Sequence, residues 1–124
     1  LHFELGRSLV AQCGSLIARV LYIKPAERTS FMVLDAGMTE LIRPALYRSF
    51  HFIENLSSQE GSVVYDVVGP ICETSDAFAR DLSLPETKRG DMLAIRSAGA
   101  YGEVMASQYN LREVAPSIFS DDFK

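Results

Sequence analysis

Short runs of aliphatic and β-branched residues, each closed by a proline, a glycine or a polar turn, constrain the fold of this chain more than any other feature. The longest run is SLIARVLYIK, residues 15–24, which Pro25 ends. Such runs are typical of β-strands, and Gly and Pro mark the turns between them. The expected strands are residues 15–24, 31–35, 51–56, 62–68 and 91–96, with a weak last strand at residues 117–119.

Helical structure is expected only in the connections. The sequence indicates a short turn or helix over residues 8–13, one helical turn at residues 39–42 and another turn at residues 101–106. The strand spacing is irregular, and the connections are too varied for a simple meander. We therefore predict a mainly β fold, a Greek-key β-barrel or sandwich with short helices in its loops.

The 124 residues have the size of one domain. A net charge of −4 provides no basic surface for nucleic acid or anionic membrane, and no apolar run is long enough for a membrane span. Two cysteines, Cys13 and Cys72, are too few for a disulfide framework and favour a reducing, cytoplasmic location. Because the chain opens on Leu1 rather than Met, we expect it to be the C-terminal domain of a longer protein.

The stretch GPICETSD, residues 69–76, places the thiol of Cys72 beside the carboxylate of Glu73 just after an expected strand. A free cysteine is most often a small buried hydrophobe, so packing is the simpler interpretation. If the pair is functional, the adjacent carboxylate disfavours the thiolate, which suits a proton donor better than a nucleophile. His2 and His51 have no metal-ligand or triad spacing with the cysteines, so we interpret them as structural or surface residues and expect no metal site.

Three further places could bind an anionic ligand. Gly6 and Arg7 can present backbone N–H groups and a guanidinium, although most such pairs lie in surface turns. Arg43 precedes Pro44, which we expect to hold it extended and to prevent a helix there, and with Tyr47 it could bind a carboxylate. A surface ion pair of Arg43 is the alternative. Tyr101 stands among small residues in SAGAYG, where a ligand or a tight turn could explain it.

The order and spelling of these segments resemble the C-terminal domain of the diaminopimelate decarboxylases, pyridoxal-phosphate enzymes of fold type III. The resemblance covers essentially the whole chain. It is carried by ELGRS, VLYIK, LDAGM, LIRPALY, VVGPICETSD, GDMLAIRSAGAYG and VMASQYN. It implies an N-terminal TIM-like barrel that carries the cofactor, and a cytoplasmic homodimer with shared active sites. Residues 1–7 would then be the end of that barrel.

The resemblance also implies residue roles. Glu4, Gly6 and Arg7 match a motif that helps to hold the cofactor phosphate, and Arg7 would also reach the substrate. Tyr101 would contact both phosphate and substrate. Leu5 stands where the family usually has proline, which makes the loop less stiff.

On the substrate side, Arg43 and Tyr47 would bind the distal carboxylate of meso-diaminopimelate. Cys72 would return a proton to Cα after loss of CO2, and Glu73 would bind the distal ammonium, both acting in the partner's site. The product would be L-lysine.

Two alternatives stay open: another basic amino acid decarboxylase of the same fold type, with ornithine, arginine or carboxynorspermidine-type substrates, and a non-catalytic β-barrel assembly module. None of the lysines, Lys24, Lys88 and Lys124, matches the lysine that binds the cofactor, so the chain alone is expected to bind the cofactor poorly and to be inactive.

Overall fold

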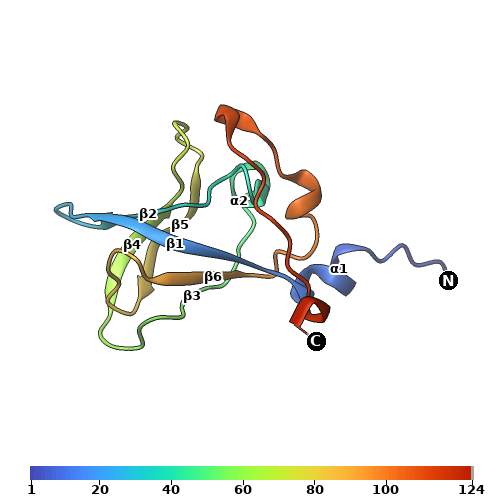
Figure 1. Ribbon diagram of the computed structural model, residues 1–124, viewed down its shortest axis with the longest axis horizontal. Helices are drawn as coiled ribbons and strands as arrows, with labels where there is room; N and C mark the ends of the chain where they lie inside the picture. Colours follow the sequence, from blue (N-terminus) through green and yellow to red (C-terminus); the bar gives the residue numbers. More distant parts are fainter. Residues whose placement is uncertain (124) are drawn as a thin grey trace.

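The computed structural model describes residues 1–123; Lys124, one of the three lysines considered above, lies outside the described residues. The described chain forms one six-stranded sheet with short helices in its connections (Figure 1). Its strands are β1 (Ser15–Lys24), β2 (Ser30–Leu34), β3 (Ile53–Asn55), β4 (Val63–Val68), β5 (Ala77–Leu84) and β6 (Met92–Arg96). The α-helices are α1 (Arg7–Val10) and α2 (Arg43–Tyr47), and the 3-10 helices are η1 (Ala11–Cys13), η2 (Glu103–Met105), η3 (Tyr109–Leu111) and η4 (Ser120–Phe123).

β1 is the central strand of the fold because it pairs with two different strands. Its first half, from Ser15 to Arg19, pairs antiparallel with β6, and its second half, from Val20 to Lys24, pairs antiparallel with β2. The register shifts between Val20 and Tyr22, so Leu21 forms a bulge. A bulge bends a strand and increases its twist, which allows β1 to leave one ladder and join the other.

The sheet order is β3-β6-β1-β2-β4-β5, and β2 and β4 form its one parallel pair. β6 returns to lie beside β1 after the chain has formed β4 and β5, which is a Greek-key type of return. One buried cluster contains side chains from all six strands, including Ile53 of one edge and Phe78 of the other. The sheet must therefore curl around this core, and the predicted mainly β, barrel-like fold is confirmed.

The strand predictions agree with the structure within two residues at each end for β1, β2, β3, β4 and β6. Strand β5 was missed because Arg80 and Asp81 interrupt its apolar pattern, and Asp81 has a positive φ of 49°. The weak strand at residues 117–119 was wrong, since this segment is irregular and exposed. Residues 38–40 form a turn rather than the helical turn predicted at residues 39–42.

The expectation that Pro44 prevents a helix was also wrong. Helix α2 begins at Arg43, with Pro44 in its first turn. Proline is well tolerated there because the backbone N–H it lacks would have no partner within the helix, and its fixed φ suits the helical conformation. No helix within residues 1–123 is long and apolar enough to span a membrane.

Candidate functional site

The first candidate region is built where the loop after β6 docks onto the N-terminal helices. Gly99 N donates to Ala11 O at 2.9 Å, and Ala98 N donates to Gly14 O at 2.9 Å. A Cβ atom on Gly99 would lie 2.3 Å from Val10 O, so only glycine permits this approach. The small residues of SAGAYG thus serve the contact between two backbone segments.

This docking brings Tyr101 to the segment before α1. A Cβ atom on Gly6 would lie 3.1 Å from the Tyr101 hydroxyl, so the two residues are in contact. Arg7 is the first residue of α1 and is partly buried, whereas Glu4 and Leu5 lie exposed ahead of it. The structure therefore unites Gly6 and Tyr101, which are far apart in the sequence.

Arg43 and Tyr47 lie together on α2. The guanidinium carbon of Arg43 is 5.2 Å from the centre of the Tyr47 ring, a cation–π contact between the ends of this short helix. The stacking orients the guanidinium and leaves its N–H groups for other partners. The surface ion pair considered for Arg43 is replaced by this contact.

His51 lies within electrostatic reach of both arginines. It is buried; Nδ1 donates to Arg96 O at 2.9 Å, and Nε2 then accepts from Ser49 Oγ at 3.3 Å. Burial lowers the pKa of His51, the Arg96 carbonyl opposes that shift, and the positive charges of Arg43 and Arg7 lower it further. His51 is thus a structural residue, as interpreted from the sequence, and both guanidinium groups lie near it.

We call Arg7, Arg43, Tyr47, His51 and Tyr101 the arginine cluster. Three buried Nε atoms, those of Arg7, Arg43 and Arg112, have no hydrogen-bond partner within residues 1–123. Arg112 Nε faces Glu40 Oε1 at 3.7 Å, whereas Arg7 and Arg43 have no ion pair within the same residues. Buried donors are almost always paired in folded proteins, so Arg7 and Arg43 indicate a place for an acceptor that the described chain does not supply. A phosphate or carboxylate supplies such acceptors, so these residues could hold an anionic group.

The second candidate region is the loop between β4 and β5, residues 69–76. Cys72 and Glu73 are exposed at its tip, and Cys72 is a free thiol. The simpler interpretation, in which Cys72 packs into the core, is therefore wrong. Asp76 stabilises the loop from beneath, because its carboxylate accepts from Met38 N at 2.6 Å and from Ile71 N at 2.7 Å. Burial raises the pKa of Asp76, although these two N–H groups oppose the shift.

Tyr109, a residue to which the sequence interpretation gave no role, contacts this loop. Its hydroxyl donates to Glu73 Oε1 at 2.6 Å. Both residues line a cavity of about 290 Å³ together with Met38, Thr39, Ile42 and Ser107. No spacing signal in the sequence could have joined residues 73 and 109, because the contact depends on how the C-terminal segment folds back over the loop after β2.

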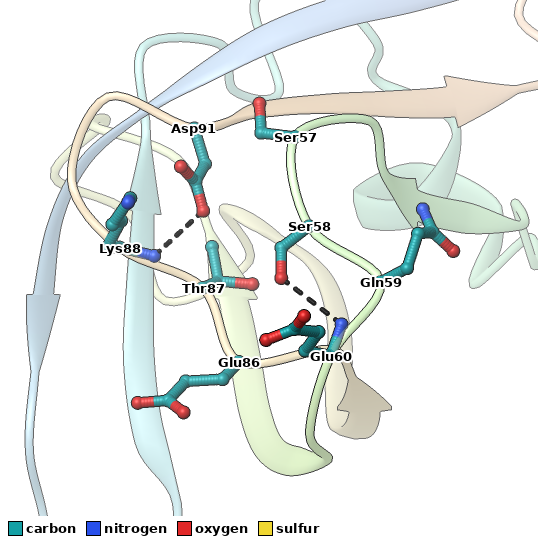
Figure 2. Close-up of a pocket in the computed structure, with 8 residues that line it drawn as sticks. All are labelled: Ser57, Ser58, Gln59, Glu60, Glu86, Thr87, Lys88 and Asp91. Carbon is teal, nitrogen blue, oxygen red and sulfur yellow. Dashed lines mark hydrogen bonds between the residues drawn. The ribbon is translucent and has the colours of Figure 1, made fainter.

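A larger cavity of about 460 Å³ lies between the loop after β3 and the loop before β6 (Figure 2). Its residues are Ser57, Ser58, Gln59, Glu60, Glu86, Thr87, Lys88 and Asp91. None of the predicted site residues is among them. Asp91 Oδ2 accepts from Lys88 N at 3.0 Å, and Thr87 Oγ1 donates to Pro85 O at 2.7 Å. The polar groups of Asp91 and Thr87 therefore already have partners within the protein. The residues 1–123 contain no group of side chains suited to a metal ion.

The fold is a curled β-sheet that carries two arginines with unpaired buried Nε atoms, and an exposed thiol and carboxylate on a separate loop. Residues 9–99 match the family described as pyridoxal-dependent decarboxylase, C-terminal sheet domain. This match covers most of the chain, and the chain belongs to that family.

Named relatives point to one activity within the family. The chain is 59% identical over 122 residues to the diaminopimelate decarboxylase of Bacteroides thetaiotaomicron, covering 98% of this chain and 32% of the relative. It is 46% identical over 123 residues to that of Helicobacter pylori, covering 98% of this chain and 30% of the relative. The chain thus spans about a third of the length of these relatives.

Solved structures agree with the fold. Diaminopimelate decarboxylase from Helicobacter pylori complexed with L-lysine aligns with a TM-score of 0.80 and 50% identity, covering 86% of this chain and 26% of that one. The enzyme from M. jannaschii in co-complex with L-lysine gives a TM-score of 0.85 and 44% identity, covering 88% and 25%. A lysine/ornithine decarboxylase from Vibrio vulnificus complexed with cadaverine gives a TM-score of 0.81 at 23% identity, covering 90% of this chain and 31% of that one. This is a likeness of fold alone.

Proposed function

We propose that this chain is the C-terminal β-domain of a diaminopimelate decarboxylase, which converts meso-2,6-diaminopimelate to L-lysine and CO2 in the last step of lysine biosynthesis. Residues 1–7 would be the end of a preceding barrel that carries pyridoxal phosphate, in agreement with a family match that begins at residue 9. The working protein would be a cytoplasmic homodimer with shared active sites.

The observation that carries this proposal is the pair of arginines. Arg7 and Arg43 come from separate segments, lie near one histidine, and have buried Nε atoms without partners within the part of the chain that the structure describes. A diamine precursor without a distal carboxylate would leave one guanidinium unsatisfied. Diaminopimelate and a cofactor phosphate together provide two anionic partners.

The residues of the arginine cluster would bind and orient the cofactor and the substrate. Gly6, Arg7 and Tyr101 would hold the cofactor phosphate, with Glu4 on the same segment. Arg43, positioned by its contact with Tyr47, would bind the distal carboxylate of the substrate, and Arg7 and Tyr101 would also reach the substrate. Pyridoxal phosphate, when bound, accepts the electron pair that is released as the carboxylate leaves.

Cys72 is proposed as the proton donor. The bond from Cα to the carboxylate breaks, CO2 departs, and the electron pair left at Cα accepts the proton of the Cys72 thiol. Water then returns a proton to the thiolate. Glu73 binds the distal ammonium, so that both ends of the substrate are recognised.

Two alternatives are less well supported. Another basic amino acid decarboxylase shares the fold, but the Vibrio vulnificus example is only 23% identical to this chain. A non-catalytic assembly module would not need an exposed thiol beside a carboxylate, nor two buried guanidinium donors without partners.

The test is Cys72→Ala in the full-length protein. We expect cofactor absorbance to be retained and turnover to fall by roughly 10²–10⁴-fold, the usual contribution of a general acid. Cys13→Ala, which removes the other free thiol, is the matched control and should leave turnover unchanged. Normal turnover by Cys72→Ala would remove Cys72 from the acid role. Absence of any diaminopimelate decarboxylation by the unmodified protein would contradict the proposed function itself.

A further inference from the structure

The contact between Tyr109 and Glu73 joins the C-terminal segment to the loop between β4 and β5. Glu73 sits at the tip of the loop between β4 and β5, and Tyr109 begins η3 in the C-terminal segment. The hydroxyl–carboxylate distance of 2.6 Å is typical of a hydrogen bond to an ionised acceptor. The two side chains form one wall of the 290 Å³ cavity that Met38 and Ile42 also line.

Tyr109 is held firmly on its own side of this contact. Ser107 N donates to Thr39 O at 2.9 Å just before it. After it, Arg112 Nη2 donates to Asp35 O at 2.5 Å, and Arg112 Nε lies 3.7 Å from Glu40 Oε1. Glu40 is itself buried, which strengthens the attraction between these two charges.

The backbone beside Tyr109 is strained. Asn110 and Leu111 both have a φ of 58°, in the left-handed region. Asparagine tolerates this conformation, but it is unfavourable for a residue such as leucine. The contacts of Ser107 and Arg112 must maintain it. Such outliers persist only where the surrounding structure over-determines the backbone, and here they directly follow Tyr109.

The hydrogen bond from Tyr109 uses only part of the acceptor capacity of the Glu73 carboxylate. A phenol donates a single hydrogen, whereas a carboxylate has about four acceptor sites. Tyr109 occupies a site on Oε1, and within residues 1–123 no hydrogen bond to Oε2 is present, so Oε2 is available for a cation. The hydrogen bond to Glu73 raises the pKa of Tyr109, and the negative charge of Glu73 adds to this shift, so the phenol stays protonated and keeps donating.

We infer that Tyr109 is a positioning residue that fixes the Glu73 carboxylate for binding the distal ammonium of the substrate. This inference rests on the proposed function, in which Glu73 recognises that group. A fixed carboxylate loses less side-chain entropy on binding than one on a freely rotating side chain, so the gain lies in substrate binding and selectivity rather than in the chemical step.

The test is a double-mutant cycle in the full-length holoenzyme, with Tyr109→Phe, Glu73→Gln and both together. The substrates are diaminopimelate and 2-aminopimelate, which lacks the distal amine. For Tyr109→Phe we expect KM for diaminopimelate to rise by roughly 3–10-fold with kcat nearly unchanged, and the preference over 2-aminopimelate to fall by the same factor. Glu73→Gln should reduce this preference further than Tyr109→Phe does. Adding Tyr109→Phe to Glu73→Gln should change neither KM nor the preference further. Tyr22→Phe, at another half-exposed tyrosine, is the control and should match the parent enzyme.

The cycle separates the two hypotheses. If Glu73→Gln lowers the preference while Tyr109→Phe has no effect, or if Tyr109→Phe has the same effect with and without Glu73, the positioning role is wrong and the recognition role of Glu73 stands. If Glu73→Gln leaves the preference unchanged, the proposed role of Glu73 fails, and the inference fails with it.

Discussion

Asp76 shows how much one side chain can organise in this molecule. It is the last residue of the stretch GPICETSD, and no sequence pattern assigns it a role. In the structure its two carboxylate oxygens accept from backbone N–H groups of two loops, those of Met38 and Ile71. The loop that carries Cys72 is therefore attached to the loop after β2 through Asp76.

Asp76→Asn is a sensitive test of this attachment. Asparagine offers one carbonyl oxygen, so its NH2 group would face the second N–H donor. We expect a loss of about 1–3 kcal/mol in the free energy of unfolding, because a buried donor is left without an acceptor. Denaturant titration of the full-length protein measures it. Asp81→Asn is the control, since Asp81 is exposed and asparagine tolerates its positive φ; a similar loss there would contradict the assignment to Asp76.

For single residues, the sequence identified side chains by their chemical type but not by their partners. Cys72 and Glu73 could be singled out because a thiol beside a carboxylate is unusual. Tyr109 could not, since its importance depends on a contact with Glu73 that only the folded chain creates. The roles of Arg7, Arg43 and Tyr101 remain predictions that the variants above and below can test.

Among the elements, the docking of the loop after β6 onto α1 and η1 has little tolerance for change. Gly99→Ala would place a Cβ atom 2.3 Å from Val10 O and 2.8 Å from Cys13 Sγ. The backbone would have to move, and Tyr101 would move with it. We expect a loss of about 1–3 kcal/mol in stability and weaker binding of pyridoxal phosphate.

Thermal unfolding and an absorbance titration with the cofactor measure both effects. Gly90→Ala is a matched control, because its φ of 93° strains alanine while the added Cβ atom meets nothing within 4 Å. It should lower Tm without changing cofactor affinity. An unchanged cofactor affinity in Gly99→Ala would show that the docking of this loop does not contribute to cofactor binding by the arginine cluster.

The elements that the sequence predicted well are those with an uninterrupted apolar pattern. β1 was placed to the residue because Pro25 closes a ten-residue run. β5 was missed because its middle, Arg80 and Asp81, is exposed at a sheet edge, where polar residues do not disturb the ladder. α2 was misjudged because proline in a first helical turn favours the helix that proline further along would break.

For the whole molecule, the two candidate regions lie on different segments, which suits sites shared between subunits. Mixing full-length Cys72→Ala subunits with subunits that lack the cofactor-binding lysine of the proposed barrel tests this arrangement. A mixed dimer would have one complete site, so equal mixing should restore about a quarter of the parent activity. Activity assays before and after subunit exchange measure it. No recovery, with mixed dimers demonstrated, would contradict donation of Cys72 across the interface.

The order of the strands in the sheet has a consequence for synthesis on the ribosome. Ser15 pairs with Arg96, so the partner of the first half of β1 is made only when most of the chain has been translated. Until then β1, β2, β4 and β5 can associate, while the β6 position between β1 and β3 stays vacant. Pairings this distant in sequence form slowly. A growing chain halted before residue 92 would therefore expose the inner face of β1, and chaperone capture should end as β6 emerges.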